Sequence, residues 1–158
     1  MSAVVIIGTA KGAFVLRPDA TRAHWSIEGP LFRGWKVTAS SRSQDGTYFL
    51  GTASFVYGAA IHRSKDLSEF RHVEAGPRYP DGGDRKLNQI WKLDCSHDAY
   101  YAGVDEAGLF RSTDGGESWE PLSGLNDHPS RAKWFPGNGG LCAHSLLIDD
   151  ARRRIHCG

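Results

Sequence analysis

One short pattern recurs along this chain at a nearly constant interval. Its clearest copy is Arg111-Ser112-Thr113-Asp114-Gly115-Gly116-Glu117-Ser118-Trp119, its second is Arg63-Ser64-Lys65-Asp66, and its faintest is Leu16-Arg17-Pro18-Asp19. The aspartates of the three copies, at positions 19, 66 and 114, are separated by 47 and 48 residues. Repeats of this length are typical of β-propeller blades, each of which is one small sheet. The recurrence therefore favours a repeat architecture.

Other elements recur with the aspartates. Gly8-Thr9, Gly51-Thr52 and Gly103-Val104 precede them by 11, 15 and 11 residues. Upstream, the stretch that begins at Trp35-Lys36 parallels the one that begins at Trp91-Lys92, so we expect Trp35 and Trp91 to open equivalent strands. The chain then starts a further copy near residue 144, which gives about three repeats and the opening of a fourth.

Short β-rich segments separated by turn residues fill each repeat, and no long window shows helical periodicity. The expected strands are 4–7, 13–16 and 24–27; 36–40, 48–51, 60–63 and 70–74; 91–95, 99–103, 108–111 and 119–122; and 145–148 and 154–157. We predict an all-β chain that forms a single partial or open β-propeller domain over residues 1–158. Its four-stranded antiparallel blades cover about 1–30, 31–77, 85–123 and 141–158, and the first blade lacks its innermost strand.

The composition narrows the class of partner. Nineteen basic and 18 acidic residues give a formal net charge of +1, so nothing favours nucleic acid or a membrane surface. The apolar N-terminal run is short and has no basic flank, which indicates a strand instead of a signal peptide or a membrane span, and we expect a cytoplasmic protein. The cysteines and histidines lack the spacings of zinc sites or disulfide frameworks. We expect no metal and no cofactor.

The Asp114 segment has the chemistry of a stapled hairpin turn. Its carboxylate can accept backbone N–H bonds across the turn, its glycines permit positive φ, and Trp119 covers the turn with apolar surface. The segment resembles the Asp-box (BNR) motif of sialidase-like β-propellers, with Ser112, Asp114, Gly116 and Trp119 at the characteristic positions. The Asp66 copy departs from the motif, because Leu67-Ser68 replaces glycine and Phe70 replaces tryptophan. The resemblance implies a structural role for these boxes, at the outer rim of the fold.

The wider chain resembles BNR-repeat proteins described as sialidase-like or exo-α-sialidases. The likeness rests on 7–12, on 103–112 and on 127–145. The resemblance implies a propeller fold. It also implies that this chain corresponds to a truncated N-terminal part of a longer protein. A sialidase needs an arginine cluster, a tyrosine nucleophile with its glutamate, and an aspartate acid/base. The nearest match to the first arginine element, Leu31-Phe32-Arg33-Gly34-Trp35, lacks its Ile-Pro, so catalytic residues remain unknown.

Loop lengths indicate which end of the sheets could bind a ligand. Successive connections of an antiparallel meander alternate between the two ends. The tight turns, including the Asp boxes, fall at one end, and the long connections 29–35, 52–58, 75–89 and 124–143 fall at the other. Long loops on a rigid scaffold are where binding residues concentrate. We therefore expect any functional face to lie opposite the Asp boxes.

Six residues are the ligand-binding candidates on that face. The richest loop supplies cations, imidazoles and an indole that suit an anionic or sugar-like ligand; alternatively, its aromatic residues and prolines pack the loop down. The two strand-opening tryptophans are either channel packing or a stacking platform. The candidates are Trp35, Trp91, His128, Arg131, Trp134 and His144.

Three functions remain open at the level of sequence. The first is a noncatalytic module that binds a small, carbohydrate-like ligand or a protein partner through the long-loop face. The second is a sialidase-like glycoside hydrolase or a fragment of one, and the third is a scaffold or assembly factor. A partial propeller can also complete a ring by pairing as a homodimer.

Overall fold

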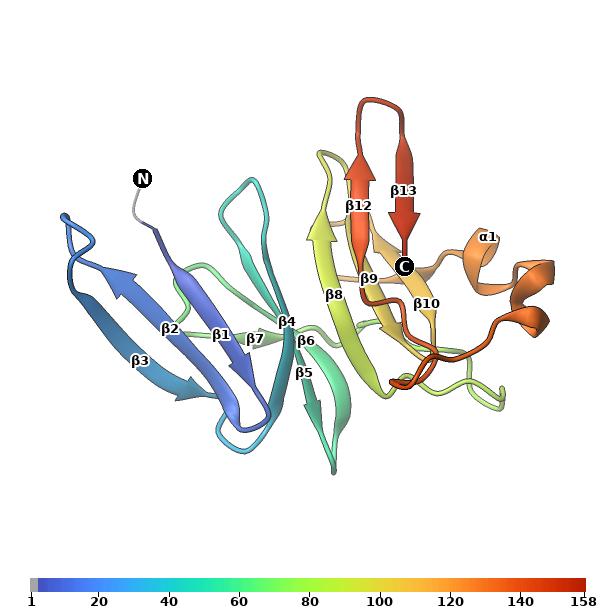
Figure 1. The fold of residues 1–158 in the computed structure, drawn as a ribbon, viewed down its shortest axis with the longest axis horizontal. Coiled ribbons are helices and arrows are strands. Elements are labelled where there is room, and N and C mark those ends of the chain that lie inside the picture. The colour runs from blue at the N-terminus through green and yellow to red at the C-terminus, as the bar shows by residue number, and fades with distance from the viewer. Residues whose placement is uncertain (1–2) are drawn as a thin grey trace.

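The structure is a computed structural model that describes residues 3–158. It is built from four antiparallel sheets that follow one another along the chain and lie side by side (Figure 1). Helical structure among these residues is limited to α1 (Ser123–Asn126) and the 3₁₀ turn η1 (Pro129–Lys133). The predicted all-β class is therefore confirmed. No helix in the described part of the chain is long and apolar enough to cross a membrane.

Within each sheet the strands lie in chain order, so every connection is a hairpin. The first sheet contains β1 (Val5–Thr9), β2 (Gly12–Pro18) and β3 (Trp25–Leu31); the second contains β4 (Lys36–Arg42), β5 (Tyr48–Ser54), β6 (Gly58–Ser64) and β7 (Arg71–His72). The third contains β8 (Gln89–Cys95), β9 (Tyr100–Asp105), β10 (Gly108–Ser112) and β11 (Glu120–Pro121), and β12 (Leu146–Asp149) pairs with β13 (Arg154–Cys157).

Every predicted strand overlaps an observed one, but their lengths differ. The last strand of each four-stranded sheet is only two residues long, where the sequence predicted four or five. β7 pairs with β6 only at His62↔His72 and Arg63↔Arg71, after which the chain leaves the regular ladder. The middle strands are longer than predicted, since β5 continues to Ser54.

Glycines set the spacing between successive sheets. A Cβ at Gly8 would lie 2.3 Å from the carbonyl oxygen of Val37, and a Cβ at Gly103 would lie 2.3 Å from that of Ala143. A Cβ at Gly51 would approach the Cβ of Ile90 to 3.1 Å. Each glycine thus lets the beginning of the next sheet come close.

The contact between each of these glycines and the next sheet identifies equivalent strands. β1, β5 and β9 each carry the glycine, so β1 corresponds to the second strand of the full sheets. Within residues 3–158 the first sheet accordingly has no counterpart of β4 and β8. By the same comparison, β12 and β13 correspond to the first and second strands.

The register also corrects one sequence prediction. Ala39 pairs with Gly51 and Lys92 pairs with Gly103, each directly after a bulge. Trp91 in β8 therefore corresponds to Thr38 in β4, and the predicted equivalence of Trp35 and Trp91 is wrong by three residues. The recurring Trp-Lys dipeptide misled the alignment, because the register is fixed by the glycine contact and not by the tryptophan.

The main core lies between the second and third sheets. It contains large buried side chains from both, among them Phe49, Ile61, Ile90, Phe110 and Trp119. A smaller apolar cluster around Val37 and Leu50 joins the first sheet to the second. The first three sheets are thus held by side-chain packing between neighbours, and β5 is buried on both faces.

Candidate functional site

The connections separate into two ends, as the loop lengths predicted. At one end, Lys65 of the second Asp box reaches the β4–β5 turn, where its Nζ lies 2.7 Å from Oδ2 of Asp45. At the other end, Trp35 before β4 stacks on Tyr57 of the β5–β6 turn, with ring centroids 5.7 Å apart. We call these the box end and the long-loop end.

At the box end, Asp114 organises the third hairpin. Its carboxylate accepts from the backbone N–H groups of Glu117 and Ser118 at 3.0 Å and from the Ser118 hydroxyl at 2.6 Å. Ser112 donates to Asp114 and accepts from the N–H of Gly116, while Nε1 of Trp119 donates to the Gly116 carbonyl. The hydrogen bonds, from Ser118 first, hold the pKa of Asp114 well below its usual range.

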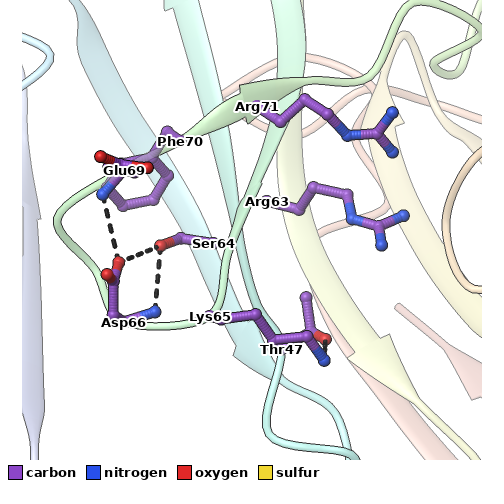
Figure 2. Close-up of a pocket in the computed structure, with 8 residues that line it drawn as sticks. All are labelled: Thr47, Arg63, Ser64, Lys65, Asp66, Glu69, Phe70 and Arg71. Atoms are coloured by element: carbon purple, nitrogen blue, oxygen red, sulfur yellow. Dashed lines mark hydrogen bonds between the residues drawn. The ribbon is translucent and has the colours of Figure 1, made fainter.

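The second box keeps this pattern without the glycines. Figure 2 shows Asp66 accepting from the backbone N–H of Glu69, at 3.1 Å, and from the Ser64 hydroxyl, at 3.0 Å. Its N–H bond from Ser68, at 2.8 Å, is the largest cause of a lowered Asp66 pKa. Leu67 adopts a positive φ of 69° in place of glycine and is buried. Asp19 in the first box likewise accepts from the N–H groups of Thr21 and Ala23, both at 3.1 Å.

A space of about 380 Å³ opens beside the second box (Figure 2). Three cations line it, but each already has a carboxylate partner. Arg63 and Arg71 both contact Glu117 of the third box, and Lys65 contacts Asp45. Because the positive charges are neutralised internally, this space is a seam between neighbouring hairpins and offers no free charge for an anionic ligand.

Three of the predicted ligand-binding residues contact one another in the loop after α1. Nδ1 of His128 accepts from the N–H of Ser130 at the start of η1, and Nε1 of Trp134 donates to the Ser130 hydroxyl at 3.0 Å. Arg131 donates to the Ala107 carbonyl and lies over the Trp134 ring, 5.2 Å from its centroid. The polar groups of His128 and Trp134 bond within the loop, and Arg131 ties the loop to the β9–β10 turn, in keeping with the packing alternative.

The other three predicted residues lie at separate places. Trp91 is in the β8 bulge and is 39% exposed. His144 precedes β12 and is exposed, with its N–H bonded to the Gly158 carbonyl at 2.9 Å. Both follow the residue that meets the spacing glycine, so they occupy equivalent repeat positions. Trp35 lies neither in the loop after α1 nor at the repeat position that Trp91 and His144 share.

Trp35 instead forms one wall of a cavity at the long-loop end of the second sheet. The cavity has a volume of about 610 Å³. Three connections contribute to it, because Trp35 lies before β4, Tyr57 is in the β5–β6 turn, and Arg78 follows β7. Its other lining residues come from β6, β7 and the segment after β7, and include His62, His72 and Glu74.

His62 is the buried polar residue among those that line this cavity. It is 9% exposed, and its ring lies among Phe32, Trp35 and His72, with centroids 4.5, 6.0 and 5.3 Å away. Burial, reinforced by the charge of His72, lowers the pKa of His62 to about 4. Its imidazole is therefore neutral at pH 7.

The Nε2 atom of His62 is buried and has no hydrogen-bond partner, the one such side-chain nitrogen or oxygen found in residues 3–158. Buried polar groups are nearly always paired, and an unpaired one costs about 1–3 kcal/mol. His62 also lines the cavity, so the side chain that carries this unpaired nitrogen borders the space.

Sequence reasoning assigned His62 and His72 to strands without a binding role. The available signal was their strand positions: His62 in β6 and His72 in β7 are direct cross-strand partners, which places two imidazoles on one face. Tyr57 was hidden in the insertion that lengthens the second repeat. The cavity therefore depends on three segments that no single motif connects.

Comparison of this chain with known proteins finds no matching family model and no matching curated protein. The Asp-box resemblance accordingly depends on the motif itself.

Proposed function

We propose that this chain is a partial β-propeller module that binds a small, hydroxyl-bearing ring compound, such as a pyranose sugar, in the cavity between Trp35 and His62. The propeller is supported by the order of the sheets. β4 contacts both β1 and β8, and β8 contacts β12, so successive sheets stack through their first and second strands as blades do.

The unpaired Nε2 of His62 is the observation that carries the ligand proposal. A neutral imidazole presents one donor and one acceptor, and its tautomer decides which of them Nε2 supplies. A hydroxyl can donate or accept, so it satisfies either tautomer. Trp35 and Tyr57 supply apolar ring surface beside it, and aromatic walls with a few placed polar groups are typical of small-molecule sites.

The charges of the cavity favour binding without turnover. Glu74 is the single carboxylate among the described residues that line it, and it bonds to Nδ1 of His72 at 3.2 Å. Glycoside hydrolysis usually requires a pair of carboxylates on opposite sides of the scissile bond. The cavity therefore supports the noncatalytic alternative over the hydrolase.

The binding test uses isotope-labelled protein and a panel of methyl pyranosides. We expect saturable shifts of the Trp35 indole and His62 ring signals in NMR titrations. The His62→Phe variant keeps the ring bulk and should lose the response, whereas His97→Phe, in the exposed β8–β9 turn, should keep it. Unshifted His62 and Trp35 signals across the whole panel would remove the proposal.

A second candidate is a protein partner at the same end. Phe55 and Val56 at the tip of the β5–β6 turn are 106% and 75% exposed, which is unusual for adjacent large apolar residues. A Phe55→Ser variant should then weaken capture of that partner while leaving glycoside binding unchanged. If the tip instead closes over the cavity, Phe55→Ser weakens glycoside binding too.

A further inference from the structure

Another space opens at the long-loop end, where the first three sheets meet. It has a volume of about 430 Å³ and is lined by strands of the second and third sheets and by Ala10 of the β1–β2 turn. The β1–β2 turn, the β5–β6 turn and the start of β8 lie together at this end, along the lower side of Figure 1. We call this space the three-sheet pocket. It shares no lining residue with the Trp35–His62 cavity.

The repeat explains why this pocket is open. Three equivalent positions line it, each two residues beyond one of the glycines that set the sheet spacing. They are Ala10, Ala53 and Asp105, which follow Gly8, Gly51 and Gly103. Because two of the three are alanine, little side-chain volume fills the space. The third repeat departs from this pattern and supplies a carboxylate.

The first strands of the second and third sheets contribute another pair of equivalent positions. Lys36 of β4 pairs with Ala53, and Gln89 of β8 pairs with Asp105. Since β4 and β8 pack against each other, Lys36 and Gln89 border the pocket from adjacent sheets. The pocket is thus lined by a cation from the second sheet and by an amide and a carboxylate from the third.

The fold does not use the charged and amide side chains of this pocket. Within residues 3–158, the side chains of Lys36, Asn88, Gln89 and Asp105 make no hydrogen bond or ion pair, although all four line the same space. In the space beside the second box, by contrast, every cation has a carboxylate partner. The three-sheet pocket therefore offers a ligand both an uncommitted ammonium and an uncommitted carboxylate.

The pocket also has apolar surface beside these charges. Phe55 of the β5–β6 turn is exposed, and it lines the pocket together with the two alanines. Tyr57, two residues further along the turn, lines the Trp35–His62 cavity instead. The turn thus contributes one aromatic ring to each space.

We propose that the three-sheet pocket binds a free α-amino acid with an apolar side chain. The carboxylate of the amino acid pairs with the Lys36 ammonium, and its ammonium pairs with the Asp105 carboxylate. The Asn88 and Gln89 amides have donors and acceptors for the remaining hydrogen bonds of both groups. The apolar side chain lies against Phe55.

The charge and size of the pocket favour this ligand class. A single inorganic ion pairs with only one of the two charged side chains, whereas a zwitterion pairs with both. The volume of about 430 Å³ lies within the range of small-molecule sites. This site is separate from the pyranose cavity, so either proposal can fail without the other.

The test is an NMR titration of the isotope-labelled protein with L-leucine, N-acetyl-L-leucine and L-leucinamide. We expect saturable shifts of the Lys36, Phe55 and Asp105 signals with L-leucine, while the Trp35 and His62 signals stay in place. Each derivative lacks one of the two charges. Each should therefore bind about tenfold more weakly, as the loss of a charged hydrogen bond predicts.

Two variants assign the charges to their partners. Lys36→Met should lose the preference for L-leucine over L-leucinamide, because the group that pairs with the carboxylate is gone. Asp105→Asn should lose the preference for L-leucine over N-acetyl-L-leucine. Lys133→Met and Asp81→Asn alter exposed residues outside the pocket, so both should keep the full preference.

The titration of the unaltered protein decides the proposal even if a variant fails to fold. Unshifted pocket signals with L-leucine would overturn it, as would derivatives that bind as tightly as the free amino acid. A folded Lys36→Met variant that still prefers L-leucine over L-leucinamide would overturn the assigned contact. Shifts at His62 instead of Lys36 would place the amino acid in the other cavity, and would also overturn the proposal.

Discussion

The polar groups at the two ends of the second sheet differ in whether they have hydrogen-bond partners. At the box end, Asp66 is bonded within its own turn, and Arg63 and Arg71 share Glu117. The cavity at the long-loop end is lined by His62, whose Nε2 is buried and has no hydrogen-bond partner. The same β6 strand leads to both, since Arg63 directly follows His62.

This difference separates residues that hold the fold from residues available to a ligand. The box-end bonds join residues close in sequence, or the same turns of adjacent repeats, so a repeated motif can encode them. The His62 environment is assembled from Phe32, Trp35 and Tyr57, which belong to connections that differ between the repeats. The conspicuous motif therefore marks the end whose polar groups bond to one another, and the irregular loops form the end where we propose that a ligand binds.

The largest effect should come from the glycines of the third box. Gly116 has a φ of 85°, and a Cβ there would lie 2.5 Å from the Phe49 ring. Gly116→Ala should destabilise the protein by about 3 kcal/mol, because strain and overpacking add. Gly115 has a φ of 77°, and a Cβ there would meet no atom within 4 Å, so Gly115→Ala should cost only about 1 kcal/mol. Urea denaturation of both variants measures the difference, and equal losses would contradict the packing at Gly116.

A nearly equal effect is expected from acidification through the His62 range. Its pKa falls from 6.5 to about 4 on folding, so the unfolded chain binds more protons between these values. The free energy of unfolding should be fully present above pH 6.5 and fall by up to about 3 kcal/mol as the pH drops towards 4. His62→Phe should flatten this slope in urea titrations, and His97→Phe should retain it. If the His62→Phe variant kept the same pH dependence of the free energy of unfolding, that dependence would come from another group.

A smaller effect should follow from removing the Asp114 carboxylate. Asp114→Ala deletes its bonds to Glu117 and Ser118 and should cost about 2 kcal/mol at neutral pH, after allowance for its exposed position. Because folding lowers the Asp114 pKa, this contribution is present above pH 4 and is lost as the pH falls below it. The variant should therefore lose less stability than the unaltered protein in this acid range, which lies below the His62 range. Equal acid sensitivity would contradict the role of this carboxylate.

The smallest effect should come from the ion pairs between boxes. Arg63→Ala leaves Glu117 with Arg71, so it should cost about 1 kcal/mol or less. The loss should diminish in high salt, because these groups are solvent-accessible. Thermal unfolding at low and high salt, with Arg33→Ala as the matched control, measures both points. A large, salt-independent loss would show that Arg63 acts mainly through packing.

The repeat made much of the fold predictable. The aspartate interval and the turn residues located all four sheets, because strand pairing within a hairpin is a local property. The register between sheets was not predictable from Trp35 and Trp91. It depends on the absence of side chains at Gly8, Gly51 and Gly103, whose importance appears only when the sheets are stacked.

The candidate site was predictable only in its general position. Loop length indicated the end at which the proposed cavity lies, and Trp35 was selected because it is a large aromatic residue there. His128, Arg131 and Trp134 had equally suitable chemistry, but His128 and Trp134 bond to Ser130, and Arg131 bonds to the Ala107 carbonyl. Composition shows which groups can bind a ligand, and only the contacts show which groups are still free to do so.

The most direct test of the contrast between the two ends is the His62 pKa, measured by NMR of its ring nitrogens with and without a bound methyl pyranoside. We expect a value of about 4 in the free protein, a neutral ring at pH 7, and a shift of the Nε2 resonance when the sugar binds. A His62 pKa near 6.5, together with an Nε2 resonance unaffected by every glycoside, would contradict both the buried unpaired nitrogen and the ligand assigned to it.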